Sequence, residues 1–250
     1  NYLKSLMAII LLMTIFIAIV FTFISFTKLF PATTNTEVES HESKYNQTLY
    51  FALDHINFHS VLSLTLPVSS LVLSNYNTSQ FAFAYSLYTF PYLLFFMLWQ
   101  QLYHKQITKL LVNGRIYYAS KLTAKIKNNI IAPLTFIFMV GSFFILPRIL
   151  SSFNIEFHSF KLILLLLSIS IFPSLLLVQQ NTIINSLGLI RQKSIIAAFL
   201  TVIYFVSLPI VAKYYSSGGI AIVHSLFIIL RFLIFNQLII RYRKMHVVLV

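Results

Sequence analysis

The sequence contains no cysteine and few acids, since only 5 Asp and Glu stand against 18 Lys and Arg in 250 residues. Without cysteine, the chain can form no disulfide, no thiolate metal site and no thiol nucleophile. Charged residues make up 9% of the chain, whereas an ordinary soluble domain has roughly a quarter. Because 58% of the residues are hydrophobic, a water-soluble globule of this length is excluded.

Signatures of enzymes are also missing. The sequence has only 5 glycines, and it contains no glycine-rich phosphate loop, no G-x-S-x-G and no H-E-x-x-H. Three of the five acids, Glu37, Glu39 and Glu42, lie together in one polar segment rather than as a pair in a cleft. We therefore expect no enzyme, no catalytic residue and no cofactor.

Long stretches without charge are what the sequence does have. A helix needs about 20 apolar residues to cross the hydrocarbon of a bilayer. Runs such as 162–167 do not alternate in polarity, which argues against a β-barrel. The predicted fold class is therefore all-α, a polytopic transmembrane helical bundle of about seven spans. The expected spans are residues 4–28, 54–74, 80–105, 128–147, 162–187, 194–212 and 219–240, with turns at Asn75–Ser79 and Ser216–Gly219.

The excess of Lys and Arg predicts the orientation of the spans. Counting cations in short loops places the carboxyl end of the first span in the cytoplasm. The basic segment 103–129 is then cytoplasmic, and its apolar residues recur at helical spacing on both sides of Asn113-Gly114. We expect two short amphipathic helices that lie on anionic membrane lipids, and no nucleic-acid partner.

Arg231 is the most informative residue inside a predicted span. It lies about 15–18 Å from either end of its span, where an arginine costs at least about 2.5 kcal/mol unless it faces protein or water. His224 precedes it by two helical turns and shares its face. Together they suggest a cationic stripe on a water-filled cavity that suits a phosphate, because no obvious buried acid pairs with Arg231. Alternatively, Arg231 binds carbonyl groups of a neighbouring helix.

A second polar group lies at the cytoplasmic start of the second predicted span. Its members are Asp54, His55, Asn57 and His59. The two histidines are four residues apart and could bind a divalent metal if a third ligand came near, but we expect a polar cavity wall and no metal. Asp54 and the histidines could also couple transport to protons.

Gln179, Gln180 and Asn181 form a third polar group, in the cytoplasmic half of the fifth span. Such amides either hold neighbouring helices together or contact a polar substrate, and the sequence favours neither interpretation.

Two sets of motifs resemble the closing section of bacterial polysaccharide flippases, the O-antigen-type translocases of the multidrug/oligosaccharidyl-lipid/polysaccharide exporter superfamily. The first set is residues 181–193 (NTIINSLGLIRQK), Pro209, Tyr215 and residues 218–222 (GGIAI). The second set is the turn 75–80, residues 83–88 (FAYSLY) and the basic loop 105–127.

This resemblance implies two six-helix lobes that face each other across a V-shaped cavity. Residues 1–30 would be the last helix of a missing amino-terminal lobe, 31–52 a cytoplasmic linker, and 53–250 the second lobe. The partner would be that amino-terminal lobe or a second copy, and about five spans would be absent. The protein would lie in the bacterial inner (plasma) membrane.

The activity that the resemblance implies is transport of undecaprenyl-diphosphate-linked oligosaccharide, for surface polysaccharides such as O-antigen or capsule. Arg231 and His224 would meet the diphosphate. The Asp54–His59 face and residues 179–181 would contact sugar hydroxyls. Two alternatives remain: an ion-coupled small-molecule exporter of the same superfamily, or a membrane-embedded glycan polymerase or ligase, which the short outer connections disfavour.

Overall fold

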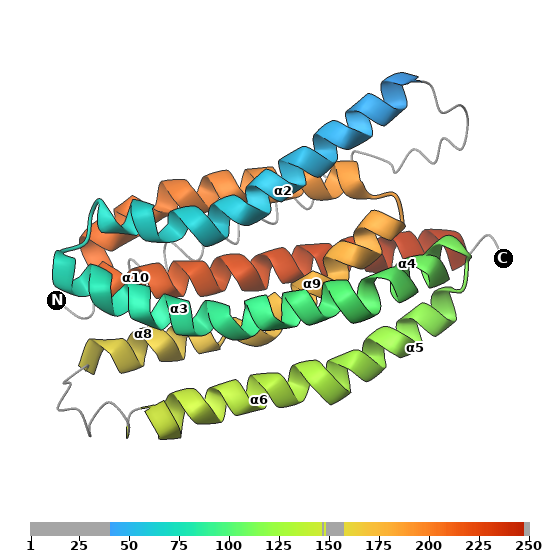
Figure 1. Cartoon of the computed structure of the whole chain (residues 1–250). Coiled ribbons are helices and arrows are strands. Elements are labelled where there is room, and N and C mark those ends of the chain that lie inside the picture. Colours follow the sequence, from blue (N-terminus) through green and yellow to red (C-terminus); the bar gives the residue numbers. More distant parts are fainter. Residues whose placement is uncertain (1–40, 147, 149–157, 248–250) are drawn as a thin grey trace. The chain divides into compact units, whose positions relative to one another are not determined.

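The computed structural model describes residues 41–146, 148 and 158–247, and these form helices joined by short turns without any strand (Figure 1). Four helical stretches among them are long and apolar enough to cross a membrane: Asn75–Val112, Ile116–Ile145, Phe160–Ser186 and Ile190–Tyr242. The prediction of an all-α, membrane-embedded protein is therefore confirmed. The expected span over residues 4–28 lies outside the described residues, so the number of seven spans remains a prediction.

The outward faces of the long helices are covered by large apolar side chains. Phe90, Met97, Phe136 and Phe144 are each more than half exposed. A surface of this kind suits contact with lipid, because in water it would be an aggregation hazard.

The first described helix, α2 (His41–Ser70), begins earlier than expected. Residues 41–52, which were expected to belong to a linker, form its first turns. An apolar stretch within it, Ser60–Ser70, is shorter than the four stretches named above. All contacts described below lie within the unit that begins at Lys44.

The turn after α2 lies earlier than predicted, at residues 71–74. Ser74 is the N-cap of α3 (Asn75–Leu98), and its Oγ accepts a hydrogen bond of 3.4 Å from the backbone N–H of Asn77. Because this cap starts the helix, the Asn75–Ser79 run forms the first turn of α3 rather than the reversal between the helices.

The basic segment 103–129 forms the two amphipathic helices that were predicted on either side of Asn113-Gly114, but they are continuous with apolar helices rather than separate. A π-helical segment joins α3 to the first basic helix, and two further π-helical segments lie in the stretch that follows Gly114. Each basic helix therefore continues directly into an apolar one. The break between them is at Asn113–Arg115, where Gly114 has φ +71°. The elements are η1 (Trp99–Tyr103), α4 (His104–Val112), α5 (Ile116–Ile126), η2 (Lys127–Ile131), α6 (Ala132–Val140) and η3 (Gly141–Ile145).

The expected fifth span is broken into α8 (His158–Ser168) and α9 (Ile171–Ser186). Pro173 has no N–H to donate to the carbonyl of Ile169, so the helix is interrupted just before it. The backbone N–H of Ser170 instead bonds Leu167 O at 3.0 Å. After α9 the chain turns at Gly188, whose φ of +73° agrees with the helix end predicted there.

The last element, α10 (Ile190–Val247), consists of two helices that reverse direction at Ser216, which has φ 56° and ψ −152°. Figure 1 shows the two halves, residues 190–215 and 217–247, running side by side. The Tyr204 hydroxyl of the first half lies 2.9 Å from His224 Nδ1 of the second half, so the two halves of α10 are in contact. The chain therefore builds an interior from α2, α3, α9 and both halves of α10.

Candidate functional site

Polar side chains form a row along the inward face of α2. Asp54, Asn57, Thr65 and Ser69 recur at three- and four-residue intervals or their sums, and the last three are buried. The row extends over about 22 Å at 1.5 Å per residue, a large part of the hydrocarbon thickness. An α-helix that turns polar groups inward and apolar groups outward is typical of a helix that faces a polar interior within a membrane.

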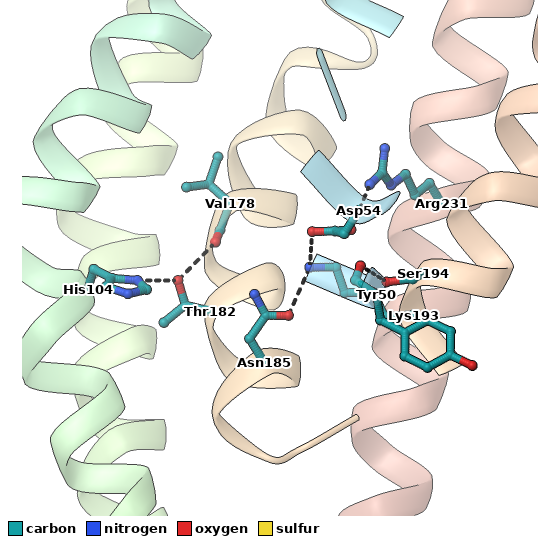
Figure 2. Close-up of polar contacts among 9 residues, drawn as sticks. All are labelled: Tyr50, Asp54, His104, Val178, Thr182, Asn185, Lys193, Ser194 and Arg231. Carbon is teal, nitrogen blue, oxygen red and sulfur yellow. Dashed lines mark hydrogen bonds and ion pairs between the residues drawn. The ribbon is translucent and has the colours of Figure 1, made fainter. Parts of the chain in front are cut away.

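An ionic cluster of three side chains lies at one end of this row. Lys193 Nζ lies 2.7 Å from Asp54 Oδ2, and Arg231 Nη2 lies 4.0 Å from Asp54 Oδ1 (Figure 2). The side chain of Lys193 is fully buried, that of Arg231 is 5% exposed and that of Asp54 is 16% exposed. Two cations thus share one carboxylate, and the cluster carries an excess of positive charge in an interior where charge is costly.

Neighbouring hydrogen bonds hold Lys193 in this cluster. Lys193 Nζ donates to Asn185 Oδ1 on α9 at 2.9 Å, and the adjacent Ser194 Oγ donates to Tyr50 O on α2 at 2.8 Å (Figure 2). These bonds lie close to the Gly188 turn, which brings the end of α9 beside the start of α10. The cluster and its hydrogen bonds therefore connect α2 with the end of α9 and with both halves of α10.

On the other side of the site, a hydroxyl of α9 joins α9 to the helix that contains α3 and α4. Trp99 Nε1 donates to Thr182 Oγ1 at 2.8 Å, and His104 Nδ1 lies 3.1 Å from the same oxygen. Side-chain bonds of this kind between membrane helices fix the position of α9, which supplies one wall of the site.

A small cavity of about 30 Å³ lies beside Arg231. This volume has room for one or two water molecules. Three of its lining residues have buried atoms without a hydrogen-bond partner among the described residues, namely Arg231 Nε and Nη2, Asn181 Oδ1 and His224 Nε2. The remaining lining residues are Val61, Leu62, Tyr88, Tyr92, Ser174, Leu177 and Ile228. The cavity therefore offers both donors and acceptors to whatever occupies it.

His224 is held in a fixed orientation at this cavity. Its Nδ1 lies 2.9 Å from the Tyr204 hydroxyl, which lies 2.9 Å from Thr65 Oγ1 on α2. The rings of Tyr85 and Tyr88 meet the imidazole edge-on, with centroids 5.2 and 5.3 Å away. The ring is thus packed on its sides and bonded at one nitrogen, and its other nitrogen, Nε2, is buried without a hydrogen-bond partner among the described residues.

Several residues that the sequence singled out come together here. Arg231, His224 and Asn181 line one cavity, and Asp54 pairs with Arg231 from outside that lining. Asn57 is buried beyond the lining, and its Nδ2 has no partner among the described residues.

The other predicted residues lie apart from the cavity or outside the description. Gln179 Nε2 donates to Thr123 O on α5 at 3.5 Å, so it joins two helices. Gln180 is buried with its Oε1 unpaired within the described part of the chain. His55 and His59 lie in α2, but their side chains are outside the described residues, and so is the possible metal pair.

Two statements about charge need correction. The sequence suggested no buried acid for Arg231, yet Asp54 lies within ion-pair distance of it. Lys193, which the expected spans leave in the loop before residue 194, lies in the first turn of α10, and its side chain is fully buried. A signal was available, since Asp54 is the only acid between Glu42 and Glu156 and so the natural partner of any buried cation.

The aromatic and hydroxyl residues of the site were not predicted. Nothing in the sequence distinguishes these residues from the other Tyr and Ser residues of the spans, because Tyr and Ser are as common on packed faces as in cavities. They are Tyr88, Tyr92, Ser174 and Tyr204.

Comparisons with protein-family models, with curated proteins and with solved structures found no match for this chain.

Proposed function

We propose that the protein is a transporter that moves undecaprenyl-diphosphate-linked oligosaccharide across the bacterial plasma membrane by alternating access, with no covalent step. One observation carries this proposal: Arg231 is buried beside a polar cavity, and two of its guanidinium nitrogens donate no hydrogen bond among the described residues, although Nη2 lies 4.0 Å from Asp54 Oδ1. A planar guanidinium with free N–H groups suits a phosphate group well.

The charge balance of the cluster supports an anionic substrate. Lys193 and Arg231 share the single carboxylate of Asp54, and Lys193 is much the closer of the two. An anion at Arg231 would neutralise the remaining positive charge without displacing Asp54 from Lys193. Since an uncompensated charge inside a membrane protein is unfavourable, the site would bind an anion in preference to a neutral molecule.

The polar row of α2 supports a passage across the bundle. A cavity of about 30 Å³ holds no saccharide, so passage needs a more open conformation. Pro67, Pro91 and Pro209 each remove a backbone hydrogen bond inside a long helix and are places where such helices can bend. In the two-lobe arrangement that the resemblance implies, the open side of the cavity would face an amino-terminal lobe or a second copy.

Arg231→Ala in the full-length transporter is expected to reduce export at least about tenfold, because a charge-assisted hydrogen bond contributes about 1.5–3 kcal/mol. The measurement is the amount of undecaprenyl-linked glycan that a lectin reaches on the outer leaflet, in cells whose own transporter is deleted. Arg115→Ala, at the turn between α4 and α5, is the matched control and should export normally.

Unchanged export by Arg231→Ala at equal membrane level would refute the anion site. A second candidate, an ion-coupled exporter of a small anionic molecule, is favoured by the partly exposed Asp54, whose Oδ1 has no hydrogen bond among the described residues and is available to a coupling ion. It predicts efflux that depends on a proton gradient and no accumulation of lipid-linked sugar when the protein is deleted.

A further inference from the structure

The hydrogen bonds around His224 decide which of its nitrogens carries the proton. They start at Thr65, whose hydroxyl donates to the carbonyl of Val61 one turn earlier in α2. A hydroxyl has one proton. Since the proton of Thr65 is used for this bond, Thr65 Oγ1 can only accept the hydrogen bond that joins it to Tyr204.

The donor and acceptor of each following hydrogen bond are then determined in turn. The Tyr204 O–H donates to Thr65 Oγ1 at 2.9 Å, so the same oxygen must accept from His224 Nδ1, also at 2.9 Å. His224 therefore carries its proton on Nδ1. In the neutral ring Nε2 then bears a lone pair, and this buried atom of a residue that lines the cavity has no hydrogen-bond partner among the described residues.

We infer that His224 is a hydrogen-bond acceptor at the cavity, so that the site, in the more open conformation that passage needs, selects an anion that also bears a hydroxyl, with the anionic group on Arg231 and the hydroxyl on His224 Nε2. This inference rests on the proposed function and names its substrate class: a sugar or polyol phosphate. Asn181 Oδ1, also unpaired on the same wall, is a second acceptor for a hydroxyl. His224 is thus a specificity residue, and Tyr204 and Thr65 are positioning residues behind it.

The arrangement excludes a simpler role for His224. A neutral imidazole that presented an N–H to the cavity would help Arg231 to hold a bare phosphate. With Nε2 as an acceptor, however, a bare phosphate oxygen beside it is repelled, whereas a hydroxyl hydrogen is bound. A site of this type discriminates strongly against analogues without the hydroxyl, because the buried acceptor is then left unpaired.

Thr65→Val tests the assignment because it removes the acceptor of the Tyr204 proton with little change of shape. Tyr204 can then donate to His224 Nδ1, and the ring is expected to move its proton to Nε2. Thr65→Ser keeps the hydroxyl and should leave the ring as it is. Nitrogen NMR of protein labelled in histidine, at about pH 9 where imidazole is neutral, distinguishes the two nitrogens. The signal is assigned by its loss in His224→Gln.

Binding in lipid nanodiscs tests the consequence with three probes: glucose 1-phosphate, methyl phosphate and undecaprenyl-diphosphate glucose. At this pH methyl phosphate has no hydrogen to donate. The wild-type protein and Thr65→Ser are expected to bind glucose 1-phosphate about tenfold more tightly than methyl phosphate, and Thr65→Val to lose that preference. Tighter binding of the lipid-linked probe than of glucose 1-phosphate would identify the lipid-linked sugar as the source of the phosphate.

The two proposals fail in different ways. If Arg231→Ala leaves the affinities for all three probes unchanged, both the anion site and the proposed function are refuted. If Arg231→Ala abolishes binding but wild-type His224 carries its proton on Nε2, or Thr65→Val keeps the preference for glucose 1-phosphate, the acceptor role alone is overturned. The wild-type NMR measurement decides the assignment even if Thr65→Val does not fold.

Discussion

Asp54→Asn is expected to lower the free energy of unfolding by about 3 kcal/mol, the usual range for a buried ion pair that loses one partner. The change removes the carboxylate 2.7 Å from Lys193 Nζ and 4.0 Å from Arg231 Nη2. Lys193 would keep only neutral amide acceptors among the described residues, Asn185 Oδ1 at 2.9 Å and the amide oxygen at position 54, and no charge to balance its own. Unfolding by sodium dodecyl sulfate in mixed micelles, followed by circular dichroism, measures the loss.

A double-mutant cycle separates the ion pair from other effects of the substitution. Lys193→Met removes the buried ammonium and retains an apolar chain of similar length, so Asp54→Asn combined with Lys193→Met should recover much of the stability. We expect a coupling energy of at least about 1.5 kcal/mol for this pair. Lys121→Met, on the exposed face of α5, should change stability by less than about 0.5 kcal/mol. Additive effects in the cycle would mean that the two groups do not interact.

The parts of the site that lie on one helix could be predicted from the sequence. Arg231 and His224 are seven residues apart, and the helical period alone places them on one face. The structure indeed places both on one cavity. The helix end at Gly188 was predictable for the same reason, since the conformational freedom of glycine is a local property.

The partners across helices could not be predicted in this way. Asp54, Lys193 and Arg231 lie on α2 and the two halves of α10, and only the packing of those helices brings them together. Lys193 was expected between two spans rather than in a helix, because a search for charge-free stretches treats every lysine as the end of a span. A lysine that is neutralised by a buried carboxylate can lie inside the bundle.

The turn between α2 and α3 was misplaced for a different reason. Asn75–Ser79 is rich in residues that favour turns, but the same residues also favour the first turn of a helix. Ser74 decides between the two by capping α3. Composition describes both outcomes equally well, so only the hydrogen bond of the cap distinguishes them.

Gly219→Ala is expected to destabilise the protein by about 2–3 kcal/mol, the range for forcing extra atoms into a packed site. A Cβ at Gly219 would lie 2.5 Å from Tyr215 Cβ and 2.6 Å from Val211 Cγ1. Tyr215 Cβ is attached directly to the backbone and cannot move aside as the end of a flexible side chain can. The reversal at Ser216 must therefore open to admit the methyl group.

Gly218→Ala is the matched control, because a Cβ at Gly218 would meet no atom within 4 Å. Both glycines are helical and adjacent, so this change should leave stability unchanged or raise it by up to about 1 kcal/mol. The same unfolding assay compares the two variants. Because the reversal aligns the halves of α10, Gly219→Ala should also disturb the Tyr204–His224 bond, which the histidine NMR signal reports. Equal stabilities for the two variants would mean that the close approach at Gly219 does not hold the halves of α10 together.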